Sequence, residues 1–193
     1  MPTLRAVVAS GGSVAVGCRE CTLRTEMHLS RPWQVTTKAD VRPRLLADRH
    51  YTRQTVGHPM WTRPGYNQIL YLEQKSGRAA AFCWWRPKWE DGRPGTIRKD
   101  GLRCIECTLF RNETRFRSSD LIRAAVEMVL TWDRALDVEW PDGLITGVNS
   151  KATQGGRNEL SQPGRCFLEA DWHYFNHPGR NVRADIWLRC GYI

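Results

Sequence analysis

The feature that most constrains the fold is a helix lying between two apolar strands. Leu102–Phe110 and Leu144–Asn149 are short apolar runs, which are typical of buried strands. Between them, Ser118–Arg134 carries Leu, Ile, Ala, Met and Val at helical spacing, which predicts an amphipathic helix. Two strands joined by a helix lie parallel in one sheet, so the chain is expected to form an α/β fold.

The loop that precedes this helix is rich in arginine. Arg111, Arg115 and Arg117 stand before Ser118 and Ser119, where the helix is expected to begin. A helix start presents unpaired N–H groups and the positive end of the helix dipole, so it suits an anion. We therefore expect these five residues to hold phosphate, either the pyrophosphate of a cofactor or the backbone of a nucleic acid.

The rest of the sequence predicts a mixed α/β sheet with helices on both faces, in a single domain over residues 39–193. Residues 1–38 form an N-terminal extension in this interpretation, with edge strands within Ser13–Leu23. A hairpin is expected where a tight turn at 75–78 joins two apolar runs. The remaining predicted elements are helices at Ala39–Asp48 and Gln162–Ala170 and strands at Tyr66–Glu73, Ala79–Trp85, Trp172–Phe175 and Ala184–Arg189.

The charge balance favours an anionic partner. The 193 residues include 29 Lys and Arg against 20 Asp and Glu, a net charge of +9. Arginine outnumbers lysine, and its guanidinium group binds phosphate through two hydrogen bonds and stacks on bases. Codon bias in a GC-rich genome explains the same excess equally well. No apolar run is long enough to cross a bilayer, and no secretion signal is visible, so we expect a cytoplasmic protein.

Basic residues are frequent after the predicted hairpin, over residues 86–117, and Trp84, Trp85 and Trp89 lie among or beside them. Such a mixture suits contacts with a nucleic-acid backbone combined with base stacking, although a solvated loop has the same composition. The residues expected to contact DNA are Arg53, Arg86, Lys88, Trp89, Arg98, Lys99 and Lys151.

Several polar side chains follow predicted elements at positions where ligands bind. His50 and Tyr51 precede an irregular loop rich in Gly and Pro, and they can move a proton or stack on a base. Asn112 and Asn149 follow two parallel strands at the same edge of the sheet. Tyr174 lies in the polar and aromatic segment DWHYFNH. We take these five residues as catalytic candidates.

Two alternative metal sites, for iron or zinc, are suggested by the ligand types. One combines His50 with His173 and His177. The other combines the two CxxC pairs, Cys18/Cys21 and Cys104/Cys107, as four thiolate ligands. Residues three apart on a strand face opposite sides, so we expect Cys104 and Cys107 to point apart. Reduced, packed thiols are the expected state in a cytoplasm.

The order of elements resembles that of the GNAT acyltransferase superfamily over residues 40–193. In that fold a central strand, a loop and a helix hold the pyrophosphate of acetyl-CoA, and the next parallel strand splays away. The resemblance implies an acyl-CoA or related donor, bound at Arg111–Ser119. The superfamily's loop usually carries glycines that let the backbone approach the pyrophosphate, and this chain has none there.

Within the superfamily the chain is most similar to the phage and actinobacterial group of Mom-type DNA-modification proteins. The motifs are HYTR at 50–53, PG at 64–65, FRNE at 110–113 and PGRCF at 163–167. The resemblance implies modification of the N6 amine of adenine in duplex DNA, which protects phage DNA from restriction in the bacterial cytoplasm. An extruded adenine is required, because N6 is paired inside the duplex. Two alternatives stay open: an acetyl-CoA-dependent N-acetyltransferase of a small amine or protein, and a non-enzymatic nucleic-acid-binding module.

Overall fold

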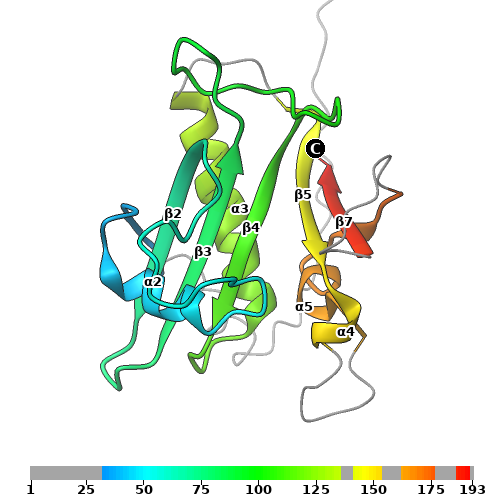
Figure 1. Cartoon of the computed structure of the whole chain (residues 1–193). Coiled ribbons are helices and arrows are strands. Elements are labelled where there is room, and N and C mark those ends of the chain that lie inside the picture. The colour runs from blue at the N-terminus through cyan, green and yellow to red at the C-terminus, as the bar shows by residue number, and fades with distance from the viewer. Residues whose placement is uncertain (1–31, 136–140, 154–161, 177–185, 192–193) are drawn as a thin grey trace, which may run out of the picture. The chain divides into compact units, whose positions relative to one another are not determined.

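A mixed seven-stranded sheet forms the centre of the compact unit Arg31–Ile193 (Figure 1). The computed structural model describes residues 32–135, 141–153, 162–176 and 186–191. The strand order is β1-β2-β3-β4-β5-β7-β6, and only β4 and β5 run parallel. The strands are β1 (Gln34–Thr36), β2 (Tyr66–Glu73), β3 (Ala79–Arg86), β4 (Cys104–Asn112), β5 (Gly143–Val148), β6 (His173–Tyr174) and β7 (Ile186–Gly191).

The strand patterns in the sequence are largely confirmed. The hairpin β2–β3 and the parallel pair β4–β5 form where the apolar runs predict them. The edge strand β1 lies within the segment 1–38 that the sequence sets apart. The expected strand positions within Ser13–Leu23 fall outside the described residues.

Four helices accompany the sheet in the described part of the chain: α2 (Val41–Asp48), α3 (Ser118–Ala135), α4 (Ser150–Thr153) and α5 (Arg165–Leu168). Helix α2 begins after Asp40, whose side chain accepts a hydrogen bond from the backbone N–H of Arg42 at 2.9 Å. The short helix α4 has no apolar period and is not predicted by the sequence. Helix α5 is shorter than expected, because the chain leaves the helix again at Glu169.

The apolar residues of the central strands alternate between two clusters, and every residue of β3 is buried. Phe82 and Trp84 pack in the cluster that includes the apolar face of α3, and the indole N–H of Trp84 donates to the Ala125 carbonyl at 3.1 Å. Ala81 and Cys83 pack in a second cluster with Leu46 of α2. The helices α3 and α2 therefore contact alternate residues of the same strand.

The parallel strands β4 and β5 pair only at their N-terminal ends and then diverge (Figure 1). Cys107 opposite Thr146 is their last paired position. At the same level β4 contains a bulge: Cys83 and Trp84 of β3 pair with Leu109 and Cys107, which leaves Thr108 as the extra residue. A bulge bends a strand and redirects its side chains, so it helps to turn β4 away from β5.

None of the helices in the described residues is long and apolar enough to cross a membrane.

Candidate functional site

Two neighbouring cavities lie around the point where β4 and β5 diverge. The smaller, of about 130 Å³, is lined by the diverging ends of both strands, by α5 and by His50 and Tyr51. The larger, of about 500 Å³, lies under the loop between α2 and β2. Thr52, Cys107, Thr108, Leu109 and Gly147 line both cavities. A substrate in the large cavity would therefore meet a group held between the strands at the Thr108 bulge.

His50 is held in the small cavity as a neutral imidazole. Burial, reinforced by the positive charge of Arg111, lowers the pKa of His50 to about 4, although a hydrogen bond with the Phe110 backbone acts in the opposite direction. The Thr52 hydroxyl lies 2.8 Å from Nδ1, and the Thr52 backbone N–H donates to Nδ1 at 3.3 Å. This contact assigns Nδ1 as the acceptor nitrogen. At neutral pH His50 can therefore accept a proton.

Tyr51 lies beside His50, with ring centroids 4.3 Å apart, and its side chain is partly exposed. The pair is thus brought together as the sequence suggests, at the wall of the small cavity. An exposed phenol beside a neutral imidazole can donate a proton or stack on a planar group.

Arg111 and Glu113 fix the position of this pair. The Arg111 guanidinium donates to Glu113 at 2.8 Å and to the Arg49 carbonyl at 2.6 Å. Arg49 in turn donates two hydrogen bonds to Glu113. Hydrogen bonds from Arg49, followed by those from Arg111, lower the pKa of Glu113 to about 2 against the opposing effect of burial. Arg111, expected to hold phosphate, instead ties the end of α2 to the end of β4.

The other residues of the expected phosphate loop line neither cavity. Arg115 is exposed, and Arg117 is exposed with a loose ion pair to Glu169 at 3.7 Å. The Ser118 hydroxyl accepts a hydrogen bond from Asn112, whereas the Ser119 hydroxyl is buried and has no hydrogen-bond partner among the described residues. Arg115 and Arg117 are therefore the two exposed basic side chains of this loop, and they can meet a phosphate.

The three other catalytic candidates have structural contacts. Asn112 organises its own loop, since its amide donates to Phe116 and Ser118 and accepts from Thr114. The Asn149 side chain accepts from the Ala152 N–H at the start of α4. Tyr174 is exposed on β6, and its hydroxyl accepts from Gln162. The structure does not bring these residues to the cavity walls.

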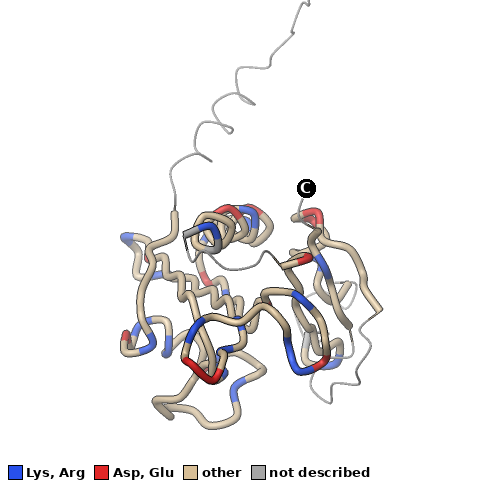
Figure 2. The backbone as a smooth tube through the Cα atoms, turned by 90° about the horizontal axis from the view of Figure 1, so that it is seen from above, with Lys and Arg blue, Asp and Glu red and all other residues tan. Residues whose placement is uncertain are grey.

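The residues expected to contact DNA divide into a buried and an exposed group. Arg86 is fully buried, Arg98 nearly so, and Arg53 forms a buried ion pair with Asp48 at 2.5 Å. The structure engages these three guanidinium groups within the protein, and Arg53 also lines the large cavity. Lys88, Trp89, Lys99 and Lys151 are exposed. Figure 2 shows the Lys and Arg positions spread around the unit rather than gathered on one face.

Neither alternative metal site is assembled among the described residues, which contain no group of three or more His, Cys, Asp or Glu arranged to hold a metal ion. Cys104 and Cys107 lie in different apolar clusters, as expected for residues that face opposite sides of β4. Burial raises the pKa of the Cys104 thiol to about 12 and that of Cys107 well above its usual value. His173 is exposed on β6, while His177, Cys18 and Cys21 lie outside the described residues.

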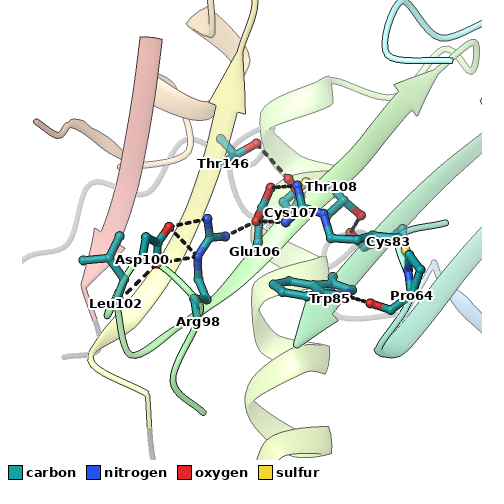
Figure 3. A network of polar contacts seen from close by, with 11 residues as sticks. Pro64, Cys83, Trp85, Arg98, Asp100, Leu102, Glu106, Cys107, Thr108 and Thr146 are labelled. Carbon is teal, nitrogen blue, oxygen red and sulfur yellow. Dashed lines mark hydrogen bonds and ion pairs between the residues drawn. The ribbon is translucent and has the colours of Figure 1, made fainter. Parts of the chain in front are cut away.

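A buried ionic cluster at the edge of the large cavity was not anticipated from the sequence (Figure 3). The Glu106 carboxylate is 4 % exposed and lines this cavity. It accepts hydrogen bonds from Arg63 at 2.5 and 3.1 Å and contacts Arg98, which also pairs with Asp100. The one available signal was an acidic residue in the middle of an apolar strand, because a buried charge requires a partner.

Comparisons of the chain with protein-family models, with curated proteins and with solved structures found no match.

Proposed function

We propose that the protein is a GNAT-like transferase that moves a small acyl-derived group from an acyl-CoA or related donor to the N6 amine of adenine in DNA. The observation that carries this proposal is the convergence of short motifs on one cavity. His50 and Tyr51 of HYTR, Phe110 of FRNE and Phe167 of PGRCF all line the cavity between the diverging strands. These segments are far apart in the sequence and meet only in the folded chain.

The shape of the site supports a donor between the strands and an acceptor in the large cavity. Gly164 of PGRCF adopts a left-handed conformation (φ 74°), and a Cβ there would lie 2.5 Å from Leu188 Cδ1. Glycine at this position therefore lets the start of α5 approach the sheet and close the small cavity. The large cavity, at about 500 Å³, is of the size that holds a small-molecule group such as an extruded base.

The proposed reaction is nucleophilic attack by the amine on the acyl carbonyl. The new bond joins the amine nitrogen to the carbonyl carbon, the thioester bond breaks, and the thiolate leaves with its electron pair. The amine loses one proton, which passes to Nδ1 of His50 through the neighbouring Thr52 hydroxyl. Tyr51 supplies a proton to the leaving thiolate, and the proton held by His50 then passes to the neighbouring Tyr51, which restores both side chains. A His50 pKa of about 4 leaves the imidazole unprotonated throughout the neutral range and also makes it a weaker base than a free imidazole.

The loop Arg111–Ser119 suits this proposal in a modified form. Arg115 and Arg117 are exposed and can meet a phosphate of the donor or of DNA, Arg117 by leaving its loose ion pair with Glu169, and Arg111 positions His50 instead. An acetyl-CoA-dependent acetyltransferase of another amine is the second candidate, because the same two cavities would serve it. The net positive charge of the chain is compatible with DNA as the acceptor but does not distinguish it from another amine.

The test uses purified protein, acetyl-CoA and a DNA duplex, followed by digestion to nucleosides and mass spectrometry. A heavier deoxyadenosine, together with release of free CoA, is expected. His50→Ala should abolish the product, whereas His173→Ala should not, because His173 is exposed and lies outside both cavities. CoA release with a small amine but never with DNA would support the second candidate instead.

A further inference from the structure

Glu106 has more positive partners than it needs. Arg98 contacts the carboxylate from the interior, where it is also held by Asp100 at 2.7 Å. The Arg98 guanidinium lies near the rings of Trp85 and Trp187, at 5.8 and 5.7 Å from the ring centroids. These contacts make Arg98 a fixed counter-charge for Glu106 that does not depend on Arg63.

Arg63 is the second partner of Glu106. Unlike Arg98, it is placed so that another group could replace it. Its side chain is 40 % exposed and lines the large cavity. It covers Glu106 with two hydrogen bonds, and its guanidinium lies 4.7 Å from the centroid of the Trp85 ring. Because Arg98 stays in place, Arg63 can turn into solvent without leaving Glu106 buried and unpaired.

The indole of Trp85 is held in an orientation that allows a planar group to stack on it. Its N–H donates to the Pro64 carbonyl at 2.8 Å, which fixes the ring in the sheet beside the loop. Gly65 adopts a positive φ of 139°, and a Cβ there would lie 2.4 Å from the indole nitrogen. The turn at Pro64 and Gly65 therefore brings the loop that carries Arg63 against Trp85.

A guanidinium that stacks on an indole and donates two hydrogen bonds to a carboxylate is a planar group with adjacent N–H donors. Nucleobases with an exocyclic amine also combine a flat face with N–H donors at one edge, and the match is closest for guanine, whose ring N–H stands next to its amine. We propose that Arg63 occupies a recognition site for an amino-bearing nucleobase, in which Glu106 accepts hydrogen bonds from the amine edge and Trp85 stacks on the ring. This inference rests on the proposed function for the choice of a nucleobase as the ligand.

In this proposal Arg63 competes with the ligand for Glu106. Removal of Arg63 should therefore raise the affinity for the ligand, whereas removal of an ordinary binding residue lowers it. Arg63→Ala should strengthen nucleoside binding, by roughly tenfold if one charge-assisted hydrogen bond is removed from competition. Glu106→Gln should weaken binding by a similar factor, because the amide offers one acceptor oxygen in place of two. If Arg63 instead bound phosphate, Arg63→Ala would weaken binding to nucleotides and leave nucleosides unaffected.

The experiment is a calorimetric titration of the full chain with adenosine, guanosine and cytidine, and with inosine and uridine, which lack the exocyclic amine. The amino-bearing nucleosides should bind more tightly to Arg63→Ala than to the unchanged protein, and inosine and uridine should bind weakly to both. Arg93→Ala is the matched control, since Arg93 pairs with Asp91 on the surface. Should Glu106→Gln fail to fold, the gain in Arg63→Ala carries the test alone.

Equal or weaker binding by Arg63→Ala, or equal binding of guanosine and inosine, would overturn the inference. These outcomes are separate from a failure of the proposed function. Nucleoside binding with the expected signature but no group transfer would leave the recognition site standing and remove the transferase. Transfer to DNA that does not depend on Glu106 would support the transferase and remove the recognition site.

Discussion

The loop before α3 and the cluster beside the large cavity use arginine in opposite ways. In the loop, Arg115 and Arg117 are exposed, and the only ion pair of Arg117 among the described residues spans 3.7 Å. In the cluster, Arg98 is 9 % exposed and is enclosed by carboxylates and tryptophan rings. The first kind can meet a phosphate, whereas the second holds the protein together. An excess of arginine in a sequence therefore does not map the nucleic-acid surface.

The largest expected effect is on stability, and it distinguishes the buried ion pairs of the cluster from ion pairs on the surface. Glu106→Ala removes the shared partner of Arg63 and Arg98 and leaves the Arg98 charge buried with Asp100 alone. We expect the free energy of unfolding to fall by about 3–5 kcal/mol, as for other broken buried ion pairs. Chemical denaturation measures this change. Asp91→Ala, which breaks an exposed pair with Arg93, should leave the free energy of unfolding almost unchanged. Equal losses in the two variants would contradict the contrast.

A second prediction concerns the pH dependence of stability that comes from His50 in the small cavity. The His50 pKa is lowered from 6.5 to about 4, so its neutral form stabilises the fold above pH 6.5. This contribution, about 3 kcal/mol, is lost as the pH falls from 6.5 to 4, because the unfolded chain binds the proton first. Denaturation of the unchanged protein and of His50→Gln at several pH values measures it. The difference between the free energies of unfolding of the two proteins should become smaller towards pH 4. A difference that stays constant with pH would show that the pKa of His50 is not lowered in the fold.

The smallest change in stability is expected in the loop. Arg115→Ala and Arg117→Ala should alter the free energy of unfolding by less than about 0.5 kcal/mol. If these side chains contact DNA phosphates, each substitution should reduce the slope of log affinity against log salt by about 1. Arg42→Ala is the control, because Arg42 is exposed but paired with Asp40. A slope that changes for Arg42 and not for the loop would place the DNA contact elsewhere.

Local patterns in the sequence predicted the elements but not the contacts between them. The 18 residues of α3 and the hairpin were visible because apolar residues repeat at regular spacing. Helix α4 was missed because four residues show no period. The bulge at Thr108 was missed because it depends on pairing with β3, and the strand pattern continues on both sides of it.

The same distinction explains the candidate site. His50 and Tyr51 were recognised from their place between a helix and an irregular loop. Glu106 was not, because its partners Arg63 and Arg98 are separated from it in the sequence and meet it only in the fold. Arg86 was taken for a DNA contact for a related reason: a charged residue at a strand end is usually exposed, and here the structure buries it.

The most direct test of the central claim, that the cavity between β4 and β5 carries out group transfer to adenine, uses DNA from cells that produce the protein. The cell supplies whatever donor the enzyme uses, so the result does not depend on acetyl-CoA. Nucleoside mass spectrometry should show a heavier deoxyadenosine with the unchanged protein and with His173→Ala, and none with His50→Ala. An unmodified nucleoside profile, with the protein soluble and folded, would contradict the account.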